Sequence, residues 1–141
     1  MLMDGDGNCL ANDLCGEASE GKLILVADDD AALNDGLRTV LEKRGFRVIQ
    51  AADGIQAKEM VRQERPDLMI LDMMMPRMGG YPVLEHFQNT AGAPPIIMIT
   101  AQEGARHKVH AEQLGVIDFI RKPFAMGRLL QSVEKGLGME A

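Results

Sequence analysis

The sequence predicts an α/β protein built around a parallel β-sheet that carries helices on both faces. Two observations support this prediction. Short apolar runs alternate along the chain with segments in which apolar residues recur every three or four positions, and the alternation repeats five times. The first apolar run, LILVA at 23–27, is continuous, which is typical of a strand buried on both faces. Helices packed on both sides of a parallel sheet provide that burial.

The segment 30–45 is expected to form the first helix. Its apolar residues fall on one stripe of a helical projection: Leu33, Leu37, Val40 and Leu41. Lys43 in the last turn and Gly45 just beyond it are typical of a helix end, because a basic side chain complements the helix dipole and glycine adopts the backbone conformations that stop a helix.

The remaining elements follow the same alternation. Strands are expected at 46–52, 67–72, 95–100 and 116–120. Helices are expected at about 55–65, 81–89, 103–115 and 125–137. Pro66 ends the second of the five helices, because the residue before a proline disfavours helical backbone. Pro82 is tolerated in the third because it falls in the first turn.

Composition limits the function classes and the location. Residues 1–21 are rich in Gly, Asn, Asp and Ser and are expected to form a flexible leader, with one domain over 22–138. The net charge of -6 argues against nucleic-acid binding through a broad basic surface. No apolar stretch approaches the roughly 20 residues that span a bilayer, and the first residues lack a secretory signal. We therefore expect a cytoplasmic protein, without a membrane partner, whose Cys9 and Cys15 are reduced.

Chemically functional side chains follow four of the expected strands. The first strand runs directly into Asp28, Asp29 and Asp30, the third ends in Asp72, the fourth ends in Thr100, and the fifth is followed by Lys122. The carboxyl ends of parallel strands meet at one edge of a sheet, where open α/β sheets bind ligands. Carboxylates suit Mg²⁺, and a carboxylate can also attack phosphorus. A cation site combined with phosphoryl transfer is therefore expected there.

The motifs at these strand ends resemble those of the receiver domain of two-component response regulators, in the manner of the single-domain chemotaxis regulators. The resemblance rests on ADDD at 27–30, LDMMMPRMGG at 71–80, ITA at 99–101 and KPF at 122–124, in that order. It covers residues 22 to about 137. It implies a flavodoxin-like fold with strand order 2-1-3-4-5, Mg²⁺ as cofactor, and a histidine kinase or histidine phosphotransfer protein as phosphoryl donor.

The resemblance also implies a role for individual residues. Asp72 matches the phosphoacceptor and a metal ligand, and Asp28 and Asp29 match the acidic pair that binds Mg²⁺. The other matches are the backbone carbonyl of Met74 as a metal ligand, Lys122 as the phosphoryl-binding lysine, Thr100 as the switch hydroxyl, Phe119 as the switch aromatic, and Pro123 after a cis peptide bond. Asp30 is expected only to start the helix that follows it.

Two positions depart from the family pattern. Gly79 stands where Asp or Asn is common, which predicts a looser loop after the third strand. Met74 places an apolar side chain beside the acyl phosphate, where it offers no help to an attacking water, so slow self-hydrolysis is expected.

These matches predict a phosphorylation-controlled regulatory protein that catalyses only its own phosphorylation and dephosphorylation. Its output would be a change in the surface of the fourth helix, fifth strand and fifth helix, acting on a downstream protein as a monomer or weak dimer. One alternative is a phosphatase of the haloacid dehalogenase type, for which Asp28 and Asp30 supply a superficial DxD pair. Two residues after Asp30, however, Ala32 replaces the Thr or Val that is usual in that family. Another is an unphosphorylated receiver-like scaffold, which the complete set of site residues disfavours.

Overall fold

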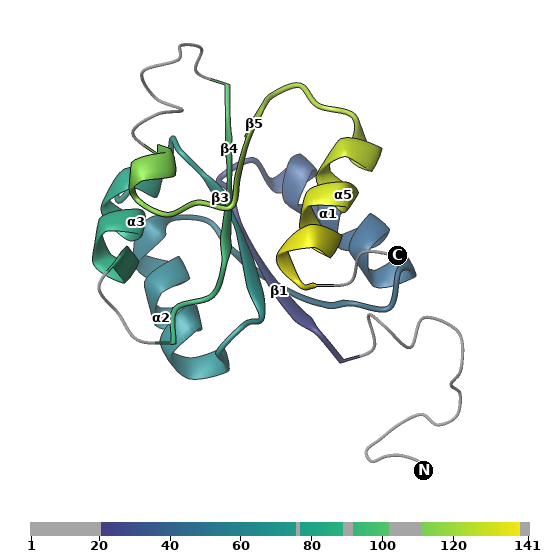
Figure 1. The fold of residues 1–141 in the computed structure, drawn as a ribbon, viewed down its shortest axis with the longest axis horizontal. Helices are drawn as coiled ribbons and strands as arrows, with labels where there is room; N and C mark the ends of the chain where they lie inside the picture. The colour runs from purple at the N-terminus through teal and green to yellow at the C-terminus, as the bar shows by residue number, and fades with distance from the viewer. Residues whose placement is uncertain (1–20, 76, 89–91, 102–110, 139–141) are drawn as a thin grey trace.

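The computed structural model describes residues 21–75, 77–88, 92–101 and 111–138, and its sheet has the predicted topology (Figure 1). Five strands lie in the order β2-β1-β3-β4-β5, and all four neighbouring pairs are parallel. The strands are β1 Leu23–Ala27, β2 Arg47–Ala51, β3 Leu68–Asp72, β4 Ile96–Thr100 and β5 Asp118–Arg121. The expectation of a flavodoxin-like fold is confirmed.

Helices cover both faces of the sheet (Figure 1). They are α1 Ala31–Lys43, α2 Gly54–Glu64, α3 Gly80–Gln88 and α5 Met126–Gly136. One apolar cluster joins the sheet to α1 and α5, and a second cluster joins it to α2 and α3. Every residue of β1, β3 and β4 is buried, which explains the continuous apolar runs of these strands. Within the described residues, no helix combines the length and apolar character needed to cross a bilayer.

Most differences from the expected elements are small. The expected strand at 46–52 spans Arg47–Ala51, and the third helix begins at Gly80, so that Pro82 does fall in its first turn. In the expected fourth helix, residues 103–110 lie outside the described residues, and 111–113 are helical. Residues 1–20 of the expected leader also lie outside them.

The fifth strand is shifted along the chain relative to the prediction. The sequence predicts a strand at 116–120, but the ladder with β4 runs from Ile97↔Asp118 to Thr100↔Arg121. The amide of Ile117 still donates to the carbonyl of Ile96 at 2.8 Å, so this residue leads into the strand without forming a ladder pair. Because the strand continues to Arg121, Lys122 follows directly at the carboxyl edge.

Candidate functional site

The first two acidic residues after β1 have different environments. Asp28 is buried, and its Oδ1 atom accepts the amide hydrogen of Asp30 at 2.9 Å. The Asn34 side chain of α1 donates to the Asp28 carbonyl at 2.7 Å, and the Asp28 amide donates to the carbonyl of Ala51 at 3.0 Å. Asp29, by contrast, is exposed. The backbone of Asp28 is therefore held from two sides, and Asp29 faces solvent beside it.

Asp30 has the role expected of it, which is to start α1. Its Oδ1 atom accepts the amide hydrogens of Ala32 at 3.0 Å and Leu33 at 3.2 Å, so it is the N-cap of the helix. This carboxylate is turned toward the helix, which removes it from the DxD pair required by the phosphatase alternative.

Asp72 lies at the end of β3 beside the carboxylates that follow β1. Asp72 is only 3% exposed, and its Oδ1 atom accepts the amide hydrogen of Met74 at 3.3 Å. Asp28, Asp29 and Asp72 each offer a carboxylate oxygen, and these oxygens all lie within 4.8 Å of one another. A hard divalent cation such as Mg²⁺ prefers such a set of oxygen donors, so the residues present fit the cofactor that the sequence implied.

Lys122 supplies the positive charge of the site. Its Nζ atom lies 2.8 Å from Oδ2 of Asp28 and 3.7 Å from Oδ1 of Asp72. Its amide donates to the carbonyl of Thr100 at 2.7 Å, and the Lys122–Pro123 peptide bond is cis, the isomer that the family resemblance implied. Burial alone would lower the pKa of Lys122, but the hydrogen bond and charge of Asp28, with that of Asp72, raise it above its ordinary value.

The electrostatics of the cluster disfavour a second buried negative charge. Burial and the neighbouring charge of Asp28 together raise the pKa of Asp72 to about 6, although the charge of Lys122 acts in the opposite direction. Bringing these carboxylates together therefore has a cost, which a divalent cation bound between them would offset.

Thr100 and Phe119 occupy neighbouring strands at different depths. Thr100 is fully buried at the end of β4, one residue beyond the Asp72↔Ile99 pair of the ladder, and so lies at the same sheet edge as Asp72. Phe119 pairs with Met98 further from that edge and is partly buried against the apolar cluster under α2 and α3. The structure thus brings Thr100 to the site and places Phe119 one strand away from it.

The loop between β3 and α3 is held by contacts that the sequence did not indicate. The guanidinium of Arg77 donates two hydrogen bonds to Oδ2 of Asp53, whose other oxygen caps α2 by accepting the amide hydrogen of Gln56 at 2.9 Å. The amide of Gly54 donates to the carbonyl of Met78 at 2.9 Å. Met74 of this loop is 56% exposed. Asp53 preceding a helix is a capping signal, but no spacing rule relates it to Arg77.

Comparisons with known proteins agree with this architecture. The family model described as "Response regulator receiver domain" matches residues 24–134. The response regulator MprA of Mycobacterium ulcerans (strain Agy99) is 40% identical over 107 residues, which cover 76% of this chain and 46% of that protein. MprA of Mycobacterium leprae (strain TN) is 39% identical over 110 residues, covering 78% of this chain and 48% of that protein. The chain therefore spans about half the length of these curated relatives.

Solved structures show the same fold. A CheY-like receiver domain protein from Methanospirillum hungatei JF-1 has a TM-score of 0.79 at 28% identity, covering 84% of this chain and 95% of that chain. The non-phosphorylated HemR receiver domain from Leptospira biflexa has a TM-score of 0.77 at 29% identity, covering 85% and 97%.

Proposed function

The chain belongs to the response regulator receiver domain family, and on that premise we propose that Asp72 is the residue through which it receives a phosphoryl group. The receiver of a two-component system is a regulatory domain, and the proposal assigns its chemistry to particular atoms. The observation that carries it is the convergence of Asp28, Asp29, Asp72 and Lys122 at the carboxyl edge of the sheet.

In the proposed reaction, a carboxylate oxygen of Asp72 attacks the phosphorus of a phosphohistidine or of acetyl phosphate. A bond forms between that oxygen and phosphorus, and the bond between phosphorus and the donor's nitrogen or oxygen breaks, with its electron pair leaving on the donor. Mg²⁺ held by Asp28, Asp29, Asp72 and the Met74 carbonyl would neutralise charge on the carboxylates and on the phosphoryl oxygens. Asp72 must be ionised to act, which its buried position beside Asp28 opposes in the metal-free protein.

Lys122 and Thr100 then bind the product. The Lys122 ammonium lies within 4 Å of both Asp28 and Asp72, so a small change of its side chain transfers a hydrogen bond to an oxygen of the new phosphoryl group. Thr100 lies at the same edge, and its hydroxyl is the donor that would bond a second phosphoryl oxygen. Phosphorylation adds about 1.5 to 2 negative charges, which both groups can stabilise.

The output is proposed to pass through β5 and the helices beside it. Lys122 directly follows β5, and Phe119 lies on the same strand with its ring partly buried. A shift of Thr100 toward the phosphoryl group would open space for that ring and change the surface formed by α5, β5 and the preceding helix. The phosphoryl donor would be a histidine kinase or a histidine phosphotransfer protein in the cytoplasm. The changed surface would bind a downstream protein. The receiver itself would act as a monomer or a weak dimer.

The decisive experiment compares the wild-type chain with Asp72→Asn in acetyl phosphate. We expect intact-mass spectrometry to show one added phosphoryl group on the wild type, dependent on Mg²⁺ and lost with EDTA, and none on Asp72→Asn. Asp35→Asn, which removes an exposed carboxylate on α1, is the matched control and should be labelled normally. Labelling of Asp72→Asn at the wild-type level would overturn the assignment. Turnover of a phosphate ester would favour the phosphatase alternative instead.

A further inference from the structure

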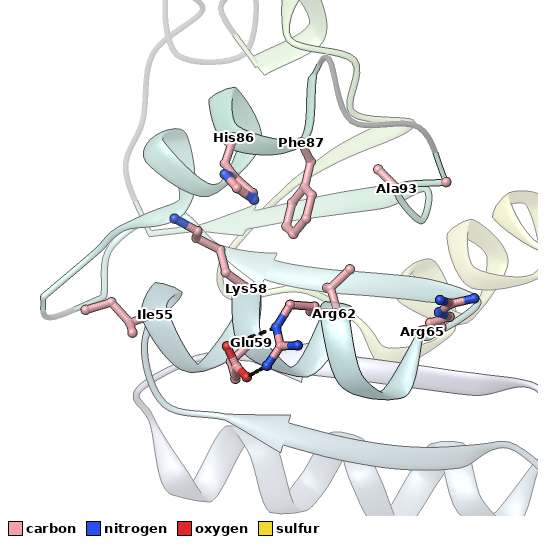
Figure 2. A pocket seen from close by; sticks show the side chains of 10 residues that line it. Ile55, Lys58, Glu59, Arg62, Arg65, His86, Phe87 and Ala93 are labelled. Carbon is pink, nitrogen blue, oxygen red and sulfur yellow. Dashed lines mark hydrogen bonds and ion pairs between the residues drawn. The ribbon is translucent and has the colours of Figure 1, made fainter.

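A groove lies between α2 and α3, away from the site at the carboxyl edge of the sheet. It encloses about 680 Å³, a volume typical of ligand-binding pockets. Figure 2 shows the ring of Phe87 pointing into the groove from α3, with Lys58 of α2 reaching toward His86. Arg65, at the end of α2, lies near the opposite end, and Ala93 lines the wall above it. The groove therefore has an apolar middle with cationic side chains toward both ends.

The charges of this lining are unbalanced. The lining contains three cationic side chains, from Lys58, Arg62 and Arg65, and one carboxylate, from Glu59. Glu59 is paired with Arg62, as the dashed lines of Figure 2 mark. Neither Lys58 nor Arg65 forms an ion pair with a carboxylate among the residues that the structure describes. An occupant with two carboxylates separated by an apolar group would complement both the charge and the apolar middle.

Residues 1–20 of this chain have that chemistry. They contain five carboxylates and no Lys, Arg or His, so they carry five of the six net negative charges of the whole chain. Residues 13–17 read DLCGE, in which Asp13 and Glu17 lie on either side of the apolar Leu14. An extended chain spans about 13 Å over four residues. Lys58 and Arg65 are seven residues apart on α2, or about 10 Å along the helix axis, so the two spacings are similar.

The start of β1 lies close to the segment that follows α2. The amide of Leu23, the first residue of β1, donates to Oδ2 of Asp67 at 2.8 Å, and the Asp67 amide donates to the Leu23 carbonyl at 2.7 Å. Asp67 is two residues after Arg65. Leu23 therefore lies beside the segment that follows α2, while the Gly21 carbonyl accepts hydrogen bonds from Arg47 of β2. The few residues between Glu17 and Leu23 are enough to reach from there to Arg65.

We propose that residues 13–17 of the leader occupy the groove between α2 and α3 in the same molecule. Glu17 lies against Arg65, Leu14 covers the ring of Phe87, and Asp13 reaches Lys58. Because the leader is covalently attached, its effective concentration at the groove is of order millimolar, so even weak contacts are populated. The contacts are exposed and ionic, so added salt weakens them. Docking shields the cationic groove from acidic segments of other proteins. None of these contacts involves Asp72, so the docking does not depend on the phosphoacceptor assignment.

The two cysteines of the chain, Cys9 and Cys15, both lie in the leader, which allows a direct test. A nitroxide spin label is attached to Cys15 of the 141-residue chain that carries Cys9→Ser, and the amide NMR signals are compared before and after the label is reduced. Docking predicts strong broadening of amides along 58–65 and 86–87, little broadening on α1, and recovery of the signals in high salt. The charge reversal Lys58→Glu with Arg65→Glu should abolish the localised broadening. Lys43→Glu, which reverses an exposed charge on α1, should leave it unchanged.

Several outcomes would overturn the proposal. Broadening that is weak everywhere, or that persists in the charge-reversed double variant, shows that the groove does not hold the leader. A second sample mixes two preparations of the chain: one carries the NMR isotopes without the nitroxide, and the other carries the nitroxide without the isotopes. Broadening in this mixture can arise only between molecules. It would show that the groove holds the leader of a second copy, which contradicts docking within one molecule. Dispersed amide spectra of each variant show that it is folded, and Arg65→Gln provides a milder substitution should the double reversal unfold the protein.

Discussion

Lys122 donates its short hydrogen bond to Asp28, at 2.8 Å, while its Nζ atom stays 3.7 Å from Asp72. Both carboxylates are buried, and Asp28 is closed off completely from solvent. The ammonium therefore neutralises the deeper carboxylate and leaves an oxygen of Asp72 available beside it. This arrangement suits a nucleophile that must receive a phosphoryl group, and it makes the stability of the metal-free domain depend on one lysine.

Replacing Lys122 with Met should destabilise the metal-free protein. The change keeps much of the side-chain length but leaves Asp28 buried without its charged partner, which costs about 2 kcal/mol. Urea unfolding in EDTA measures the difference, and Mg²⁺ should narrow it because a cation among the carboxylates replaces the missing charge. Lys135→Met on α5 controls for loss of an exposed lysine and should have little effect. Equal stability of Lys122→Met and wild type in EDTA would contradict this account of the ion pair.

Asp72→Asn should have the opposite effect on stability. Burial, assisted by Asp28, raises the pKa of Asp72 to about 6, so between about pH 4 and 6 the folded state holds a proton that the unfolded state has released. Stability of the wild type therefore falls as pH rises through this window, and the variant lacks that fall. At pH 7 in EDTA we expect the variant to be more stable by about 1 to 2 kcal/mol.

Urea unfolding of Asp72→Asn and wild type in EDTA, at pH 7 and at pH 4, measures this effect. At pH 4 the difference in unfolding free energy between the two proteins should nearly vanish. Asp29→Asn removes the exposed carboxylate of the cluster and should raise the unfolding free energy at pH 7 by less than Asp72→Asn does. A variant that is less stable than wild type at pH 7 would show that ionised Asp72 is not destabilising in the metal-free fold.

Asp118 should contribute to resistance against acid. Burial would raise its pKa, but hydrogen bonds from Arg128 and Ser132 outweigh that effect and lower the pKa to about 2. A depressed pKa gives stability that is present above the ordinary pKa of about 4 and is lost as pH falls toward 2. We expect Asp118→Asn to lower the unfolding free energy at pH 7 by about 1 kcal/mol, since the pair is partly exposed.

Thermal unfolding between pH 7 and pH 3 tests this, and the gap between wild type and Asp118→Asn should narrow on acidification. Asp35→Asn on α1 serves as the control carboxylate, whose effect on thermal stability should be small at each pH. A gap that widens toward low pH would mean that the β5–α5 ion pair does not stabilise the fold.

The sequence predicted which residues lie at the carboxyl edge of the sheet better than it predicted which of their side chains pair with one another. Asp28, Asp72, Thr100 and Lys122 could be assigned to one edge because parallel strands direct their carboxyl ends the same way. The preference of Lys122 for Asp28 depends on side-chain depth within the site, which strand-end position does not encode. Asp30 could be assigned as a helix start because capping is local, within three residues of the cap.

Contacts between distant segments account for what the sequence did not predict. Val116 and Ile117 have strand-like composition, yet the β5 ladder begins at Asp118, because register depends on the neighbouring strand. Arg77 and Asp53 are 24 residues apart, and their ion pair depends on how the loop after β3 meets the start of α2. Neither residue type is unusual at its position, so local pattern could not relate them.

Arg77→Ala should weaken Mg²⁺ binding. Arg77 ties the β3–α3 loop to Asp53 at the start of α2, and that loop carries the Met74 carbonyl proposed as a metal ligand. Loss of a group bonded directly to a metal ligand costs about tenfold or more in metal affinity; Arg77 bonds Asp53 and no proposed ligand, so we expect a loss of up to about tenfold. Titration calorimetry or amide NMR with Mg²⁺ measures the change, and Arg62→Ala, away from the site, is the control arginine. Unchanged affinity would show that the loop keeps its position without this anchor.

Gly80→Ala and Gly36→Ala should change stability in opposite directions. A Cβ atom at Gly80 would lie 2.7 Å from the Asp72 carbonyl oxygen and 2.9 Å from the Met73 Cα, and because both are backbone atoms the loop beside the phosphoacceptor must shift. We expect a loss of about 1 to 3 kcal/mol together with slower acetyl phosphate labelling. Gly36 lies inside α1, and apart from its chain neighbours and the backbone of its own helix no atom lies within 4 Å of an added Cβ. Alanine there should therefore stabilise by about 0.5 to 1 kcal/mol through helix propensity. Urea unfolding of the two variants beside wild type measures both effects, and a stabilising Gly80→Ala would show that α3 can start without this close contact to β3.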